Sequence, residues 1–179
     1  MDWNTLFMNM VYLVAMKSKD ERAHIGAVIV GPDKEVRSTG YNSFPRGIDD
    51  GVRERQKSPE KFHWFAHAEA NAIFNAARVG VPLKDCTLYT NGVPCTACVH
   101  GVINSGITEV VVDKTWDEGS DEGKWGPMAE RTREMFQESG VKLTYWRGEL
   151  VHIHKFRRGK NISALHDPLC FEDGTRIGE

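Results

Sequence analysis

Short apolar runs alternate with helical patterns throughout the second half of the chain. Three such runs, Cys86–Thr90, Val110–Val112 and Val141–Trp146, have the length and residue types of buried strands, and helical spacing fills the segments between them. A chain that crosses through a helix between neighbouring strands returns in the same direction, so these strands should be parallel. The alternation therefore predicts an α/β domain with helices packed on the sheet.

The first half of the chain adds one helix and one hairpin to this pattern. Ile25–Val30 and Glu35–Tyr41 flank a Gly-Pro-Asp turn signal and predict two paired strands. Residues 3–17 have helical spacing and predict an opening amphipathic helix. The apolar stripe expected on this helix consists of Trp3, Leu6, Phe7, Met10, Leu13 and Val14.

Three further helices are expected after the hairpin. They lie at residues 67–79, 95–105 and 127–139. The third begins at a proline, and a glycine follows directly after the second and after the third, which suits helix starts and ends. The first of the three should pack through one face of its apolar residues. That face consists of Ala70, Ile73, Phe74 and Ala77.

Two polar stretches show no evident secondary structure in the sequence. Residues 42–63 combine prolines, glycines and many charges, and residues 113–126 form a second polar segment. Loops of this length in a compact domain are more often functional than idle. We therefore expect the longer stretch, 42–63, to contribute to function.

The size and charge of the chain indicate one folded domain and a short extension. The chain has 179 residues, of which we assign 1–146 to the domain and the weakly patterned 147–179 to a tail or packing arm. Its 23 Lys and Arg residues are offset by 25 Asp and Glu, so the net charge is −2. Because nucleic-acid-binding proteins usually carry a basic excess, a polynucleotide partner is disfavoured, whereas a small anionic metabolite stays open.

The apolar content predicts neither a membrane span nor a disulfide scaffold. No window of about 18 residues is apolar enough for a transmembrane helix. The apolar stretch Met8–Met16 lacks the basic residues and the cleavage site of a secretory signal. Four cysteines are too few for a disulfide-stabilised fold, and two of them form a Cys95-x-x-Cys98 pair typical of metal or redox chemistry. We therefore expect a protein of the reducing cytoplasm.

Two short motifs at predicted helix starts carry the chemistry. His67-Ala68-Glu69 begins one helix, and Pro94-Cys95-Thr96-Ala97-Cys98 begins another. The two sulfurs are three residues apart, so they share a helix face, and the positive end of the helix dipole favours their thiolate forms. Two thiolates and one neutral imidazole suit a zinc ion whose fourth position is left for water, as in catalytic sites. We therefore expect His67, Cys95 and Cys98 to bind one zinc ion.

Glu69 is expected to move the protons of this site. Zinc lowers the pKa of a bound water from about 15.7 towards about 7, and the released proton needs an acceptor. At the first turn of a helix the backbone can direct both His67 and Glu69 towards a point beyond the helix end, which makes Glu69 an acid/base rather than a ligand. The spacing matches the H-x-E … P-C-x-x-C signature of zinc-dependent nucleobase deaminases.

Each motif alone also has a more ordinary explanation. A lone histidine is more often a satisfied core or surface residue, and a lone Cys-x-x-Cys is more often half of a structural zinc site or a redox pair. The sequence contains no second Cys-x-x-Cys to complete a four-thiolate site, and a redox pair does not normally follow a His-x-Glu. A non-catalytic zinc module is a further alternative, which the intact Glu69 disfavours.

The sequence resembles the deoxycytidylate (dCMP) deaminases of the cytidine deaminase superfamily. The resemblance covers roughly residues 5–145 and rests on five segments: 18–20 (SKD), 26–30 (GAVIV), 40–47 (GYNSFPRG), 67–73 (HAEANAI) and 94–98 (PCTAC). The resemblance implies a three-layer α/β/α fold with a five-stranded mixed sheet, one catalytic Zn²⁺ per chain and, as is usual in the family, a homohexameric assembly.

The resemblance implies hydrolytic deamination of dCMP to dUMP and ammonia, which feeds dTMP synthesis. Deamination of dCTP, or of both nucleotides, is the alternative within the same chemistry. A deaminase of tRNA or single-stranded DNA is less favoured, because such enzymes need a cationic track and the short segment 154–160 is the one basic patch of the sequence.

Substrate contacts are also implied by the resemblance. Asn42 would contact the deoxyribose, and Ala68 would meet the base through its backbone. Lys19 and Lys124 are candidates for the phosphate, and Trp116 for stacking on the base or sugar. The sequence also departs from the family where a pair of small polar residues usually precedes Gly-Ala-Val: here that pair is His24-Ile25.

Many dCMP deaminases are activated by dCTP and inhibited by dTTP. Arg46, Gly47 and Arg53 of the long polar stretch would hold such a triphosphate, with Mg²⁺ bound to it, because guanidinium groups suit phosphate oxygens. Some related phage enzymes carry a second, structural zinc. The tail offers His152, His154, His166 and Cys170 for one, but their irregular spacing favours ordinary surface residues.

Overall fold

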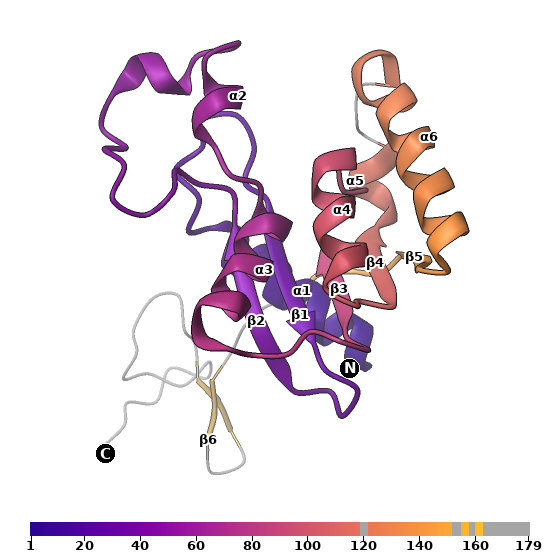
Figure 1. Ribbon diagram of the computed structural model, residues 1–179. Coiled ribbons are helices and arrows are strands. Elements are labelled where there is room, and N and C mark those ends of the chain that lie inside the picture. The colour runs from indigo at the N-terminus through magenta and orange to yellow at the C-terminus, as the bar shows by residue number, and fades with distance from the viewer. Residues whose placement is uncertain (119–121, 152–154, 158–159, 163–179) are drawn as a thin grey trace, which may run out of the picture. The chain divides into compact units, whose positions relative to one another are not determined.

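The computed structural model describes residues 1–118, 122–151, 155–157 and 160–162, without the side chains of 117–126 and of the residues beyond 151 (Figure 1). The contacts divide the chain into two compact units, Met1–Gly148 and Glu149–Glu179. In the second unit β6 (Lys155–Arg157) and β7 (Lys160–Ile162) form an antiparallel pair. The first unit contains the five-stranded sheet and the helices that the described residues form.

The five strands form one mixed sheet in the order β2-β1-β3-β4-β5. Strand β1 pairs antiparallel with β2 and β3, whereas β3, β4 and β5 run parallel. The bounds of the strands are Gly26–Val30 (β1), Val36–Tyr41 (β2), Thr87–Thr90 (β3), Glu109–Asp113 (β4) and Lys142–Trp146 (β5). The predicted hairpin and the predicted parallel strands late in the chain are confirmed.

Helices cover both faces of the sheet, and this confirms the three-layer α/β/α architecture (Figure 1). Strand β1 shows the layering: Ala27 and Ile29 belong to one buried cluster, and Val28 and Val30 belong to the other. The first cluster lies under the helices α3 (Ala68–Val79), α4 (Thr96–Asn104) and α6 (Glu122–Ser139), and the second lies under α1 (Trp3–Ala15). No helix formed by the described residues is both long enough and apolar enough to span a bilayer.

The predicted packing face of α1 is confirmed in part, because Phe7 is buried and Leu6, Met10 and Val14 pack against the core, whereas that of α3 is mostly wrong. Helix α1 buries Phe7, Met8, Val11 and Ala15, while about half of the Trp3 and Leu13 surface stays exposed. Helix α3 buries Ala68, Glu69, Ala72 and Ala76, while Phe74 is 61% exposed. Helix α3 approaches the sheet too closely for large side chains at the contact. A Cβ on Gly40 of β2 would lie 2.3 Å from the Ala68 carbonyl oxygen, so α3 must turn its alanines towards the sheet.

The two predicted loops contain short helices. The stretch 42–63 includes the 3₁₀ helix η1 (Arg53–Gln56) and the beginning of α2 (Lys61–Trp64). The stretch 113–126 includes α5 (Lys114–Glu118) and the beginning of α6. Pro127 therefore lies inside α6 and not at its first position, which corrects the predicted helix start. It is the sixth residue of the helix, beyond the first four N–H groups that lack helical partners in any case, so its missing N–H removes one intrahelical hydrogen bond.

Four chain segments meet at one edge of the sheet, at the carboxyl ends of β3 and β4. Gly26 at the start of β1 pairs with Tyr41 at the end of β2, and Ala27 pairs with Thr90 at the end of β3. The segments 18–25, 42–66, 91–95 and 114–118 therefore leave or enter the sheet at this edge. In α/β sheets ligands usually bind outside the carboxyl ends of the parallel strands. This edge is thus the expected location of the site.

A partly buried hydrogen bond attaches α1 to the same edge. The Tyr12 hydroxyl donates to Asp113 Oδ2 at 2.6 Å, and Asp113 Oδ1 accepts from the backbone N–H and the hydroxyl of Thr115. Burial, followed by the hydrogen bond to the Asp113 carboxylate, raises the pKa of Tyr12 well above its usual range. The folded protein therefore keeps this phenol protonated.

Removal of the Tyr12 hydroxyl should alter the alkaline stability of the fold. A phenol whose pKa is raised on folding stabilises the fold fully below its unfolded pKa of about 10, and this contribution is lost as pH rises above that value. We expect the free energy of unfolding of the wild type to fall between pH 10 and 11.5, by up to about 1.4 kcal/mol per pH unit from this group. Tyr12→Phe should show a shallower fall in denaturant titrations over this range. Equal slopes for both proteins would contradict the assignment.

Candidate active site

The first turn of α3 places His67 and Glu69 at the edge of the sheet. His67 caps the helix with an extended backbone (φ −72°, ψ 157°), and its carbonyl accepts the first helical hydrogen bond, from Asn71 N–H. The imidazole makes no capping bond and is therefore directed away from the helix. The Asn71 amide donates to the Tyr41 carbonyl at 2.8 Å, which attaches this turn to the end of β2.

Helix α4 places the two thiols in the same way. Cys95 is the extended capping residue, and Cys98 lies at the third position of the helix, buried. The preceding residue is held from α6, because the hydroxyl of the fully buried Thr132 donates to the Pro94 carbonyl at 2.9 Å. No sequence pattern indicates this role of Thr132, since nothing marks a helical threonine as the partner of a residue 38 positions earlier.

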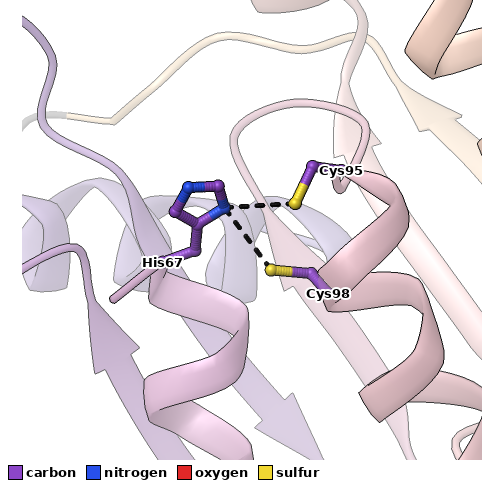
Figure 2. Close-up of side chains that lie close together, drawn as sticks. All are labelled: His67, Cys95 and Cys98. Carbon is purple, nitrogen blue, oxygen red and sulfur yellow. Dashed lines mark hydrogen bonds between the residues drawn. The ribbon is translucent and has the colours of Figure 1, made fainter. Parts of the chain in front are cut away.

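The structure brings the three predicted ligands together. Figure 2 shows the His67 ring facing both sulfurs, with Nδ1 3.3 Å from Cys95 Sγ and 3.5 Å from Cys98 Sγ. Zinc–sulfur bonds of about 2.3 Å and zinc–nitrogen bonds of about 2.0 Å in a tetrahedron separate the nitrogen from each sulfur by about 3.5 Å. Among the described residues, no fourth His, Cys, Asp or Glu belongs to this group of ligand atoms. The set therefore fits zinc with one position left open.

The protonation of the two thiols shows that this group favours a cation. The hydrogen bond from Cys98, ahead of the one from His67, lowers the pKa of Cys95 to about 4. The same hydrogen bond raises the pKa of Cys98, so the pair shares one proton. Both sulfurs also lie at the positive end of the α4 dipole, which favours negative charge. A divalent ion can replace the shared proton and stabilise both thiolates.

Glu69 lies next to the ligands without joining them. Cys98 Sγ donates to Glu69 Oε2 at 3.7 Å, while Glu69 is outside the group of ligand atoms. The residue is 6% exposed, and burial raises the pKa of its carboxyl group. This is the geometry that the sequence predicted for an acid/base beside the metal; its part in proton transfer stays a prediction.

Asn42 is held firmly inside the protein. Its Oδ1 accepts from the Ile25 N–H at 2.9 Å, and its amide donates to Asp20 Oδ2 and to the Ala23 carbonyl, both at 2.9 Å. Both amide hydrogens are thus used within the protein. The contact between Asn42 and a deoxyribose stays a prediction, while the structure shows Asn42 joining β2 to the segment 20–25.

Asp20 is the centre of this connection, and the sequence did not indicate it. It is 4% exposed, accepts from the backbone N–H groups of Arg22 and Ala23, and forms an ion pair with Lys61 of α2 at 2.5 Å. Lys61 is six residues before His67, so this ion pair also holds the chain that leads into the zinc ligands. Two backbone hydrogen bonds between Ser43 and Ala66 join the two ends of the segment 43–66 that contains Lys61.

The remaining predicted residues divide between two cavities. Lys19, Arg46 and Gly47 line one of about 250 Å³, called here the Arg46 cavity, in which Lys19 forms an ion pair with Asp50 at 2.7 Å. Trp116 lines another of about 510 Å³, called the Arg22 cavity.

Other predicted residues contribute to neither cavity. Arg53 lies in η1, outside the lining of both. Ala68 is fully buried at the first position of α3, where its N–H needs no helical partner. The Lys124 side chain and the tail residues His152, His154, His166 and Cys170 lie outside the described residues.

Known proteins share this arrangement. Residues 1–114 match the cytidine and deoxycytidylate deaminase zinc-binding region. Deoxycytidylate deaminase of Homo sapiens is 33% identical over 146 residues, which cover 79% of this chain and 78% of the relative. Deoxycytidylate deaminase of Mycobacterium phage D29 is 34% identical over 126 residues, covering 63% of this chain and 95% of the relative. The crystal structure of dCMP deaminase from cyanophage S-TIM5 in complex with dCMP and dUMP has a TM-score of 0.61 and 19% identity, covering 79% of this chain and 94% of that one.

Fold and ligand set together define a zinc-dependent hydrolase of the deaminase class. The chain belongs to the cytidine and deoxycytidylate deaminase family, as the sequence motifs indicated. The solved structure supports the fold independently, since its similarity lies in the arrangement of the chain more than in its residues.

Substitution of one thiol should remove both the metal and part of the stability. We expect Cys98→Ala to contain almost no zinc, because two remaining ligands hold the ion weakly. Loss of an ion present at 1,000 times its Kd costs about 4.1 kcal/mol, or roughly 10 °C in Tm for a chain of this size. Elemental analysis and thermal unfolding measure both effects. Cys86→Ala, which changes another buried cysteine outside the ligand group, should keep its zinc; a zinc-loaded Cys98→Ala would contradict the ligand assignment.

Proposed function

We propose that the protein deaminates dCMP to dUMP and ammonia, which would supply dTMP synthesis, and that residues 1–146 carry this activity while 147–179 form a tail or packing arm. The observation that carries the proposal is the buried Glu69 carboxyl group beside a three-ligand zinc site. A purely structural site has no use for an open position with a carboxyl group next to it. Curated relatives named deoxycytidylate deaminase support the choice of substrate.

Glu69 can perform every proton transfer that the reaction needs. When held by His67, Cys95 and Cys98, zinc supplies a polarised water of lowered pKa. Glu69 takes a proton from the attacking water as the new C–O bond forms at C4 of cytosine, and its raised pKa makes it a stronger base. The same carboxyl group delivers this proton to N3, then takes the proton of the new C4 hydroxyl group and passes it to the amine, so that the C4–N bond breaks, the C4 carbonyl forms and ammonia leaves. The backbone N–H of Ala68, at the start of α3, would face the base.

Replacement of Glu69 by glutamine should separate chemistry from metal binding. Glu69→Gln keeps the size and the hydrogen-bonding ability of the side chain but cannot accept the proton, so we expect kcat to fall by about 10²–10⁴-fold or more. Zinc content should stay at the wild-type level, because Glu69 is not a ligand. Glu138→Gln, an exposed carboxylate near the end of α6, is the matched control. Near-normal turnover by Glu69→Gln would remove Glu69 from the mechanism.

A substrate panel tests the proposed reaction directly. Ammonia release is followed with deoxycytidine, dCMP, dCTP, CMP and a single-stranded oligodeoxynucleotide. We expect the highest kcat/KM for dCMP. A higher kcat/KM for dCTP would assign the protein to the triphosphate alternative, and preference for the oligonucleotide would overturn a mononucleotide substrate altogether.

We also propose that the Arg46 cavity binds a regulatory triphosphate with Mg²⁺, dCTP as activator and dTTP as inhibitor. Support comes from its lining, in which Lys17, Lys19 and Arg46 provide positive charge and Tyr41 and Phe65 provide apolar ring surface. Arg53 would have to reach the triphosphate from outside the cavity. The substrate panel repeated with dCTP, dTTP and Mg²⁺ tests this proposal, and an unchanged rate with both nucleotides would contradict it.

Assembly into a homohexamer is a further part of the proposal. Several large apolar side chains on α1 and α3 are exposed in the single chain, and burial between copies would remove them from water. They are Trp3, Leu13, Phe74 and Val79. Light scattering during size-exclusion chromatography measures the assembly, and a monomer at micromolar concentration would contradict it.

A further inference from the structure

We propose that Arg22, with His24 next to it, binds the 5′-phosphate of the substrate in the Arg22 cavity. This inference rests on the proposed function, because it names the group that distinguishes a nucleotide from a nucleoside at the same active site. Neither residue was among the phosphate candidates that the sequence suggested, which were lysines.

The Arg22 cavity has the size and the walls of a ligand site. Its volume is about 510 Å³, which is within the usual range of ligand pockets. Segment 20–24 forms one wall, the carboxyl-terminal half of α1 forms another, and Trp116 of α5 forms a third. Trp116 also lies near Tyr12, with ring centroids 6.5 Å apart, so two aromatic rings border the space.

The walls of the cavity contact the chain segments that lead to the zinc ligands, although none of those ligands lines the cavity itself. Trp116 rests against Gly92, where an added Cβ would lie 2.8 Å from the indole ring, and Gly92 is three residues before Cys95. On the other wall Asp20 is paired with Lys61, whose positive charge acts on His67. A base at the zinc site would therefore leave its sugar and phosphate near segment 20–24.

Arg22 and His24 are the available cationic or proton-donating groups of this wall. Both are exposed, and within the part of the chain that the structure describes, neither side chain has a hydrogen bond or an ion-pair partner. The Arg22 backbone is nevertheless fixed, because its N–H donates to Asp20 Oδ1 at 2.8 Å. Because the backbone is fixed and the guanidinium group has no partner among the described residues, Arg22 can bind an incoming anion without first breaking another contact.

The acidic residues of the wall leave this assignment in place. Asp20 lines the cavity, but it is only 4% exposed and its charge is paired with that of Lys61 at 2.5 Å. Glu21 is exposed at the cavity rim, where water screens its repulsion of a phosphate. Arg22 can offer two parallel N–H donors to two phosphate oxygens, a geometry that a single carboxylate at the rim does not cancel.

Lys19, the earlier candidate, is poorly placed for this role. Its ammonium group is paired with Asp50 at 2.7 Å, and it lines the Arg46 cavity instead of the one that contains Trp116. The basic residues are thus divided between the two cavities. Lys17, Lys19 and Arg46 line the Arg46 cavity proposed for an effector, and Arg22 and His24 line the cavity proposed for the substrate phosphate.

The experiment compares phosphorylated and unphosphorylated ligands on the zinc-loaded enzyme. Arg22→Ala is expected to lower kcat/KM for dCMP by about 10- to 100-fold, mainly through KM, which is the factor expected for one lost charged hydrogen bond. The product pair dUMP and deoxyuridine, used as competitive inhibitors, provides a second measurement. Arg22→Ala should raise the inhibition constant of dUMP by the same factor and leave the inhibition constant of deoxyuridine unchanged. Arg22→Lys should restore part of the loss, because it keeps the charge without the paired donors.

Arg78→Ala, an exposed arginine in the last turn of α3, is the matched control, and zinc content and Tm should be unchanged in all three variants. The inference is wrong if Arg22→Ala weakens inhibition by dUMP and by deoxyuridine to the same extent, or if it weakens inhibition by neither. It is also wrong if Arg46→Ala, in the other cavity, produces the phosphate-selective loss instead. A wild-type enzyme that does not deaminate dCMP would overturn the proposed function itself, which separates the two failures.

Discussion

The site depends on two helices that begin side by side at one edge of a sheet. The capping residue of each helix supplies a ligand, His67 from α3 and Cys95 from α4, and Cys98 follows one turn later. This convergence requires α3 to lie very close to β2, which only a residue without a side chain at position 40 permits. Two helix dipoles then point their positive ends at the sulfurs, and the shared proton of the two thiols can be exchanged for a metal ion.

Around this centre, buried polar contacts hold the segments that would contact substrate. Asp20 joins the segment before β1 to Asn42 and to Lys61, so the chain that leads into His67 is attached at a second point. Asp113, at the end of β4, likewise joins two segments: it accepts hydrogen bonds from Tyr12 of α1 and from the first turn of α5. Polar groups buried with their partners restrict the conformation of these segments more than apolar packing does. The two cavities lie between them and differ in the charges that they expose.

Sequence patterns were reliable for local features and unreliable for orientation. The strands, most helix ends and the zinc ligands were predicted because each depends on residues close together in the chain. The buried face of α3 was predicted only in part: Ile73 packs against the core, but Phe74 is exposed, because the contact with Gly40 selects the alanines. Helix α5 and the early start of α6 were missed, because their sequence is polar and contains Pro127. The ion pair between Asp20 and Lys61 joins residues 41 positions apart, and no local pattern marks it.

The sequence by itself determined the chemistry: a histidine, a glutamate and two cysteines at short spacings suffice to indicate zinc and an acid/base, because ligand type and helix geometry are local properties. Only the tertiary structure decided which cations share a cavity with which aromatic ring. Lys19 and Trp116 are separated, and Arg22 and His24 are brought to the Trp116 wall. The physical reason is that these neighbours come from segments joined through the sheet, and their distances depend on strand order and helix packing rather than on separation along the chain.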